Sequence, residues 1–164
     1  MDSIRLVPLA KEHLSDIVRI EKVSNSSPWS EQSFRSELTN PQSVFLVALV
    51  NGEVVGFGGL WLVVDEAHIT TVAVDPERRH QGIGRKLMLE LLELAGARGM
   101  TRSTLEVRAG NEAALKLYES LGYVRASCRR MYYPDNDEDA VVMWLHCIPS
   151  PFKGEGEGCL TRGL

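Results

Sequence analysis

The apolar residues of this chain follow two kinds of pattern. Some form short runs rich in Val, Ile and Leu, which predict β-strands, and others recur every three or four positions, which predicts amphipathic helices. The predicted strands cover residues 4–9, 44–50, 54–64, 67–74, 103–108, 123–133 and 141–147. The predicted helices cover residues 14–23, 31–40, 81–95 and 112–121. This succession of strands and helices predicts a mixed α/β layer fold.

Turn and cap residues stand at the borders of these elements. Asn51-Gly52 separates two predicted strands and is a strong signal for a hairpin. Ser30 and Asn111 each precede a predicted helix, which their side chains can cap, and Gly122 stands where a helix commonly ends. These residues support the predicted order of elements.

The composition is that of an ordinary globular domain. Its 164 residues are 44% hydrophobic and 24% charged, which fits one domain with a sizeable core. A net charge of −4 gives no indication of a nucleic-acid-binding face. The most apolar stretch, residues 44–64, is interrupted by Asn51, Gly52 and Glu53, which argues against a membrane span.

Three cysteines are present, Cys128, Cys147 and Cys159. Their odd number and their lack of metal-like spacing favour a reducing compartment over a disulfide framework and indicate no metal site. Cys128 and Cys147 fall in predicted strands, so we expect them in the core. The sequence shows no signal-peptide pattern, and the cytoplasm is the expected location.

The run Arg-His-Gln-Gly-Ile-Gly-Arg at 79–85 joins a predicted strand to a predicted helix. Its glycines allow a ligand to approach backbone N–H groups closely, and the helix N-terminus adds a partial positive charge. The junction therefore suits a phosphate or pyrophosphate, although a Gly-x-Gly pair alone marks a tight turn at least as often. A Rossmann domain is disfavoured, because these glycines follow several hairpin-type strands rather than an opening βαβ unit.

Several motifs resemble the GNAT N-acetyltransferases. They are Val-Ala-Val-Asp-Pro at 72–76, the glycine run at 79–84, Leu-Glu-Val-Arg at 105–108, and residues 111–123. The similarity covers about residues 4–148. Within that superfamily the chain is similar to the bacterial ribosomal-protein-alanine N-acetyltransferases through Pro-Trp-Ser at 28–30, Asp-Glu-Ala at 65–67 and Arg-Arg-Met-Tyr-Tyr-Pro at 129–134.

This resemblance implies a GNAT fold, with a mixed, mostly antiparallel central sheet flanked by about four helices. We expect a single domain over residues 1–148 and a flexible tail over residues 149–164, where a Gly-Glu repeat lacks apolar periodicity.

The resemblance also implies acetyl-CoA as co-substrate, with no metal. The backbone of one strand would pair with the pantetheine arm, at Val72, Ala73 and Val74. The loop and helix start would hold the pyrophosphate, at His80, Gln81, Gly82, Ile83, Gly84 and Arg85. Asn111 is a further implied cofactor contact, and its alternative role as a plain helix cap is compatible with that contact.

For catalysis, the resemblance points to Glu106 as the base and Tyr118 as the acid. A carboxylate can take a proton from an amine, and Leu105 and Val107 flank Glu106 with apolar surroundings of the kind that make a carboxylate more basic. A phenol with a pKa of about 10 stays protonated at neutral pH and can protonate a leaving thiolate. The alternatives are an outward-facing strand residue at Glu106 and a half-buried core aromatic at Tyr118.

Trp29, Tyr132 and Tyr133 are the candidates for binding a peptide, because flat rings and hydroxyl groups suit an extended chain terminus. A packing role for these three side chains is nearly as well supported. The implied acceptor is a protein N-terminus, the N-terminal alanine of a small-subunit ribosomal protein. An α-amine with a pKa of about 8 loses its proton more easily than a lysine with a pKa of about 10.4.

Two other functions stay open at this point. One is acetylation of lysine side chains or small-molecule amines, and the other is a non-catalytic module that binds acetyl-CoA and a partner. We expect a monomer or weak dimer, without direct binding to nucleic acid or membrane.

Overall fold

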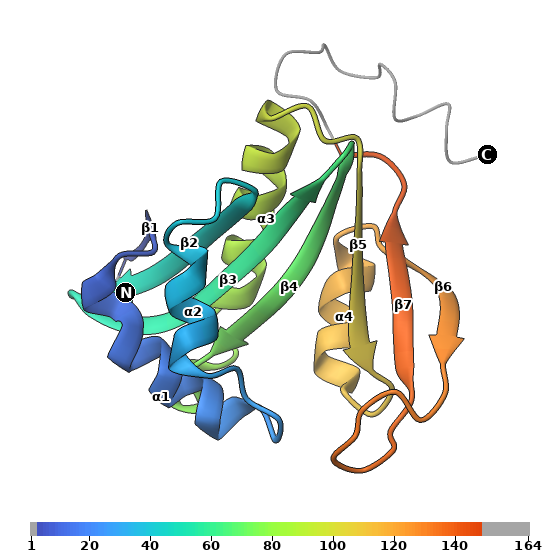
Figure 1. Ribbon diagram of the computed structural model, residues 1–164, viewed down its shortest axis with the longest axis horizontal. Helices are drawn as coiled ribbons and strands as arrows, with labels where there is room; N and C mark the ends of the chain where they lie inside the picture. The colour runs from blue at the N-terminus through green and yellow to red at the C-terminus, as the bar shows by residue number, and fades with distance from the viewer. Residues whose placement is uncertain (1–2, 149–164) are drawn as a thin grey trace. The chain divides into compact units, whose positions relative to one another are not determined.

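The structure is a computed structural model that describes residues 3–148, and the tail predicted over 149–164 lies outside the described residues. The described part forms a seven-stranded sheet in the order β1-β2-β3-β4-β5-β7-β6 (Figure 1). The strands are β1 (Ile4–Pro8), β2 (Ser43–Val50), β3 (Glu53–Val63), β4 (Glu66–Val74), β5 (Arg102–Arg108), β6 (Val124–Arg129) and β7 (Ala140–Leu145). The helices are η1 (Lys11–His13), α1 (Leu14–Ser24), α2 (Glu31–Glu37), η2 (Pro76–Arg78), α3 (Ile83–Ala97) and α4 (Glu112–Ser120).

Strand pairing confirms the predicted mixed, mostly antiparallel α/β architecture. The pairs β1–β2, β2–β3, β5–β7 and β6–β7 are antiparallel, and the pair β4–β5 is parallel. The chain divides into two compact units. Of the described residues, the first unit contains 3–61 together with Thr70–Leu91, and the second contains Leu62–Ile69 together with 92–148.

The first unit is built around an aromatic cluster. α1 and α2 lie on one face of β2 and β3, and α3 lies on the other (Figure 1). Phe34 of α2 meets Phe45 and Phe57 edge-on, with ring centroids 6.0 Å and 5.4 Å away. Leu14 and Ile17 of α1 pack into the same cluster, because their spacing puts them on one helix face. Burial of this surface is what holds α1 and α2 to the strands.

On the opposite face, glycines of β3 let α3 approach closely. A Cβ added at Gly56 would lie 3.3 Å from Cγ2 of Ile83, and one at Gly58 would lie 3.1 Å from Cδ1 of Leu91. Both contacts are tight, so side chains at these glycines would push α3 away. The apolar side of this helix is largely buried, with Ile83, Leu87 and Leu91 each no more than 1% exposed and Leu94 half-buried.

In the second unit, α4 lies against one face of β5 and β7 (Figure 1). Leu105 and Val107 of β5 are buried, as is Leu115 of α4. The buried hydroxyl groups of Ser103 and Tyr123 share a hydrogen bond of 2.7 Å, so two polar groups in this core satisfy each other.

The predicted turn and caps are confirmed. Asn51 and Gly52 have φ values of 52° and 81°, as a two-residue hairpin of the primed type needs. Ser30 Oγ accepts from Ser33 N–H at 3.1 Å, and Asn111 Oδ1 accepts from Ala114 N–H at 3.1 Å. Side-chain oxygens therefore satisfy N–H groups that each helix start leaves unpaired.

The strand predicted over 123–133 is wrong at its end, because β6 stops at Arg129. Met131 adopts a left-handed conformation with φ 52°, and its N–H donates to Asp139 Oδ1 at 2.9 Å. That turn takes the chain out of the ladder with β7, so Tyr132 and Tyr133 lie in a loop.

Two expectations about cysteines are also wrong. Cys128 is free but exposed on β6 rather than buried in the core. Cys147 is half-buried and disulfide-bonded, although the sequence favoured a reducing compartment over a disulfide framework. Within residues 3–148, no helix is long and apolar enough to cross a membrane.

Glu21 is a buried carboxylate at the end of α1, 1% exposed. Its Oε2 accepts from Trp29 N–H at 2.9 Å and from Asn25 Nδ2 at 3.2 Å. Burial raises the pKa of Glu21 above its ordinary value of 4.5, and the two hydrogen bonds partly oppose that rise. Glu21 therefore ties the α1–α2 connection together at the cost of holding an ionisable group away from water.

This environment predicts a pH dependence of stability. Because its pKa is raised in the folded state, Glu21 binds more proton in the folded protein than in the unfolded chain once the pH passes about 4.5. The free energy of unfolding of the wild type, relative to that of Glu21→Gln, should therefore fall as pH rises from 4 through the folded-state pKa, and then level off.

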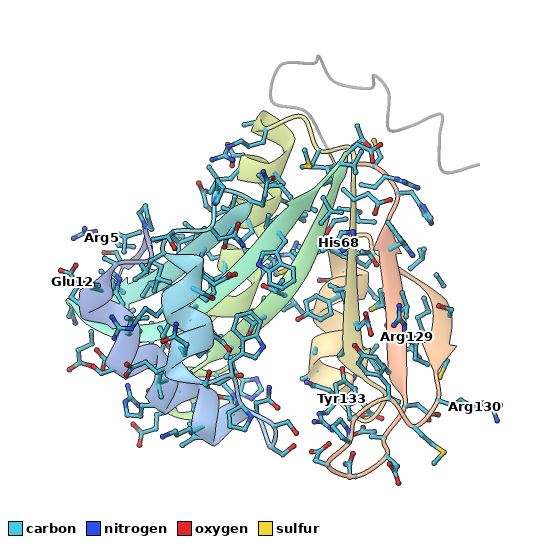
Figure 2. The ribbon with its side chains drawn as sticks, viewed as in Figure 1. Arg5, Glu12, His68, Arg129, Arg130 and Tyr133 are labelled. Atoms are coloured by element: carbon cyan, nitrogen blue, oxygen red, sulfur yellow. The ribbon has the colours of Figure 1, made fainter. Side chains whose placement is uncertain are left out.

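Urea unfolding of both proteins at intervals from pH 4 to pH 8 measures this difference. Glu12→Gln is the matched control, because Glu12 is exposed on η1 (Figure 2) and should show no such trend. A difference between wild type and Glu21→Gln that stays flat across the range contradicts the prediction.

Candidate active site

Glu106 lies on the open face of β5, opposite the face that carries Leu105 and Val107. Neighbouring residues of a strand point to opposite faces, so the two flanking apolar side chains point away from Glu106. They are 4% and 6% exposed, whereas the Glu106 side chain is 31% exposed. The apolar surroundings expected for Glu106 from these neighbours are therefore wrong.

Polar groups surround Glu106 instead. Arg129 Nε lies 3.7 Å from Glu106 Oε2. The negative charge of Glu106, followed by burial and a hydrogen bond to Glu106, raises the pKa of Tyr132. The carboxylate thus meets a guanidinium and a phenol while staying partly open to solvent.

Tyr118 has the opposite environment. It lies on α4, buried, with its ring 6.0 Å from that of Tyr123 in an edge-on arrangement. Burial, with a smaller contribution from the neighbouring phenol of Tyr133, raises the pKa of Tyr118 to about 12. Tyr118 therefore keeps its proton far above neutral pH.

Tyr133 links these groups. Its ring centroid lies 5.1 Å from that of Tyr132, and Arg108 Cζ lies 3.9 Å above it. Burial raises the pKa of Tyr133, the charge of Arg108 opposes that rise, and the charge of Glu106 adds to it. Tyr133 is thus within electrostatic range of both Glu106 and Tyr118. Figure 2 shows Tyr133 and Arg129 in the part of the molecule formed by β5, β7 and β6.

Four of the predicted residues lie in the second unit and are linked by electrostatic interactions, since Glu106 acts on Tyr132 and Tyr133, and Tyr133 acts on Tyr118. We call these four residues the β5 cluster. Asn111, a predicted cofactor contact, belongs to the same unit and caps α4.

The predicted cofactor residues of β4 lie in the first unit. Val72, Ala73 and Val74 are all half-buried. The parallel ladder between β4 and β5 pairs Glu66–His68 with Arg102–Thr104. Backbone groups of residues 72–74 lie beyond that ladder and suit pairing with an extended ligand that carries amides.

The glycine-rich loop has the backbone geometry expected of an anion site. His80 and Gly82 adopt φ values of 65° and 79°. The helix starts at Ile83, two residues later than predicted, and Lys86 N–H donates to Gly82 O at 3.0 Å. The N–H groups of residues 83–85 precede that first helical bond, so they belong to the turn that binds anions in other helices. Gln81 is exposed beside them, Arg85 is exposed, and Gly84 is half-buried.

Trp29 lies in the first unit, where packing explains it. Its ring is 5.2 Å from that of Phe34, and it adjoins the aromatic cluster as a half-buried residue. Its N–H is held by Glu21. The packing alternative for Trp29 is thus well supported, and its role toward a peptide stays a prediction.

Sequence reasoning missed the charged residues that hold the cluster together, above all Arg108, Arg129 and Glu138. The sequence contained one signal for Arg108. The segment 135–139 is acidic and suits a cationic partner, and Arg108 follows Glu106 by two positions, on the same face of a strand. Among residues 3–148, no group of three His, Cys, Asp or Glu side chains is placed to hold a metal ion.

Comparison with known proteins places these features in a family context. The sequence model of the acetyltransferase (GNAT) family matches residues 14–123. The ribosomal protein bS18-alanine N-acetyltransferase of Escherichia coli K12 is 42% identical over 128 residues, which cover 77% of this chain and 86% of the relative. The N-alpha-acetyltransferase RimI of Mycobacterium tuberculosis is 39% identical over 120 residues, covering 71% and 74%.

Solved structures agree with the sequence relatives. The crystal structure of the ribosomal-protein-S18-alanine N-acetyltransferase from Escherichia coli matches with a TM-score of 0.82 at 37% identity, covering 94% of this chain and 98% of that chain. The crystal structure of Ard1 from Thermoplasma volcanium matches with a TM-score of 0.80 at 28% identity, covering 86% and 95%.

Proposed function

The chain belongs to the acetyltransferase (GNAT) family, and we propose on this premise that it acetylates the N-terminal α-amine of a protein, with acetyl-CoA as donor. The acceptor proposed is the N-terminal alanine of ribosomal protein bS18, because relatives of 42% identity carry that activity in their names. The observation that carries the chemistry is the β5 cluster, where a partly exposed carboxylate and a buried, firmly protonated phenol occupy one unit.

Acetyl-CoA, when bound, would supply the acetyl group as a thioester, and CoA would leave as a thiol. The first unit has features that fit its polar parts. A Cβ added at Gly82 would meet nothing within 4 Å, so this position is open to a phosphate oxygen, and the first turn of α3 supplies N–H donors. The backbone of residues 72–74 would hold the amide-bearing arm as an added strand.

Glu106 is proposed as the base. An α-amine with a pKa of about 8 is mostly protonated at neutral pH, and it must lose a proton before it can attack a carbonyl carbon. The Glu106 carboxylate, 31% exposed and next to Tyr132, can take that proton directly or through a water molecule.

Tyr118 is proposed as the acid. As the bond between carbonyl carbon and sulfur breaks, the sulfur gains negative charge, and a proton from Tyr118 Oη would neutralise it. Because burial keeps its pKa near 12, Tyr118 carries this proton throughout the physiological range. Tyr132 and Tyr133 would flank the acceptor peptide, and Trp29 is a weaker candidate for the same role.

Release of CoA with two matched peptides tests the proposed function. One peptide has a free N-terminal alanine, and the other has a blocked terminus and an internal lysine. We expect turnover with the free terminus alone, because its amine loses a proton more easily. Turnover with both peptides would instead indicate lysine or general amine acetylation. Binding of acetyl-CoA with no turnover on any amine would indicate a non-catalytic module.

Replacement of Glu106 by Gln tests the base. The substitution keeps the size of the side chain and removes its ability to accept the amine proton, so kcat should fall by about 10²-fold or more. The dissociation constant of acetyl-CoA, measured by calorimetry, should stay unchanged. Glu119→Gln is the control, because Glu119 is exposed and pairs only loosely with Arg125, at 3.4 Å. Wild-type kcat in Glu106→Gln would eliminate Glu106 as the base.

Replacement of Tyr118 by Phe tests the acid. Loss of the phenol proton should lower kcat by about 10²-fold or more, while the ring keeps its packing. Because the pKa of Tyr118 is about 12, Tyr118 stays protonated between pH 8 and pH 10. Ionisation of Tyr118 should therefore not lower the kcat of the wild type over this range.

Tyr123→Phe is the matched control for Tyr118→Phe, because it removes a buried hydroxyl that is hydrogen-bonded to Ser103. It should lower the free energy of unfolding by about 1 kcal/mol and leave kcat near that of the wild type. Equal kcat values in the two variants would argue against Tyr118 as the acid.

A further inference from the structure

Arg108 belongs to β5, and its side chain contacts the loop that joins β6 to β7. Its Nη2 donates to Asp135 Oδ2 at 3.1 Å, and its Nη1 donates to Asn136 Oδ1 at 3.2 Å and to Glu138 Oε1 at 3.4 Å. One guanidinium thus holds three side chains of the loop over residues 130–139. The side chains of Arg108 and Asp135 are each only 20% exposed, so the surrounding water weakens this pair less than an open surface pair.

The same guanidinium lies over the ring of Tyr133, with Cζ 3.9 Å from the centroid. A cation this close to the face of an aromatic ring is attracted to it, and the planar guanidinium also packs on the ring. Arg108 therefore packs on the ring of Tyr133 while it also pairs with Asp135 and Glu138.

Backbone bonds pass this restraint through the loop. Tyr133 N–H donates to Glu138 O at 3.2 Å, and Asp137 N–H donates to Tyr133 O at 2.8 Å. Glu138 Oε2 accepts from Gly110 N–H at 2.7 Å, which ties the other end of the same carboxylate to the segment that follows β5. The loop is thus bound to one end of β5 at several points, and Arg108 is the residue that the side-chain contacts share.

Arg108 stands two residues after Glu106, on the same face of β5. The strand fixes the separation of these two side chains. The loop residues that Arg108 binds are therefore held at a fixed position relative to the Glu106 carboxylate. Arg129 provides a geometric link to the tyrosines, because its Nε lies 3.7 Å from Glu106 Oε2 and its Cζ lies 5.5 Å from the ring centroid of Tyr132.

We propose that Arg108 is a positioning residue for the acceptor peptide, which fixes the loop over residues 130–139 so that Tyr132 and Tyr133 stand beside Glu106. This inference rests on the proposed function, because it assigns the loop to the binding of an extended protein N-terminus. Arg108 acts through the tyrosines and takes no part in proton transfer.

Arginine is required at this position because of its shape. A guanidinium can bind two carboxylates through separate nitrogens while its face covers a ring. A lysine ammonium keeps the charge, but it cannot hold Asp135 and Glu138 and cover Tyr133 at once. Arg108→Lys should therefore loosen the loop without removing the positive charge.

Steady-state kinetics with the alanine-initiated peptide tests the inference. Arg108→Lys should raise the KM for the peptide about tenfold, with kcat within about threefold of the wild type and the KM for acetyl-CoA unchanged. Arg102→Lys is the matched control, because Arg102 stands at the opposite end of β5 from Arg108, pairs with Glu66, and lies 5.3 Å over the ring of Trp144. Arg102→Lys should leave the KM for the peptide unchanged.

Two further measurements separate positioning from general loss of structure. Trypsin should cut the Arg130–Met131 bond several-fold faster in Arg108→Lys than in the wild type or Arg102→Lys, because Arg130 is exposed at the start of the loop (Figure 2). In a double-mutant cycle, Tyr133→Leu should remove most of the effect of Arg108→Lys on the KM for the peptide, since both act through one ring.

The outcomes distinguish this inference from the proposed function. A wild-type protein that acetylates no free-terminus peptide overturns the proposed function and the acceptor role with it. An active wild type whose Arg108→Lys variant has faster cleavage but an unchanged KM for the peptide overturns the acceptor role alone. Unchanged cleavage, or additive effects of Arg108→Lys and Tyr133→Leu, overturns the claim that Arg108 holds the loop through Tyr133.

Discussion

The alternation of side chains along β5 is the constraint on which the second unit depends. On one face, Leu105 and Val107 are buried with α4, and this packing places the helix that carries Tyr118. On the other face, Glu106 and Arg108 meet the β6–β7 loop. A shift of one residue in the register of β5 would exchange the two sets, burying both charges and exposing the core. The hydrophobic contact with α4 thus also determines where the polar groups stand.

Glu106 and Tyr118 lie in contrasting environments. Glu106 is partly open to solvent, and its Oε2 lies 3.7 Å from Arg129 Nε. Tyr118 is buried, and burial opposes loss of its proton. Tyr133 lies in the electrostatic field of both groups and is itself held by Arg108. The β5 cluster therefore owes its arrangement to packing on one side and to ion pairing of the loop on the other.

The first unit uses glycine for two different purposes. In β3, Gly56 and Gly58 have no side chains to obstruct the apolar stripe of α3, so the helix packs close to the strand. Before α3, Gly82 supplies a positive φ in open space and places its carbonyl to accept the first helical bond. The glycines of β3 thus allow α3 to pack closely, whereas Gly82, in the loop before α3, leaves the start of the helix accessible.

Local sequence determined the strands and helices of this protein, the Asn51-Gly52 hairpin, and the helix caps at Ser30 and Asn111, because hydrophobic spacing and turn chemistry act between near neighbours. The motifs around the glycine run also indicated the family, which the matched residues 14–123 confirm. Those same patterns placed Glu106 and Tyr118 on their elements, while their catalytic roles stay proposals.

Only the tertiary structure decided what surrounds these side chains. The residues that flank Glu106 in the sequence predicted apolar surroundings. Its actual neighbours are Arg129 and Tyr132, which lie more than twenty positions away in the sequence. The end of β6 was set by a turn at Met131 that bonds Asp139, and the role of Arg108 depends on loop carboxylates brought to it by the β6–β7 pairing. Contacts of this kind form only when segments far apart in the sequence come together. The spacing of residues along the chain therefore determined the helices and strands, and the tertiary structure determined which charged groups lie next to each site residue.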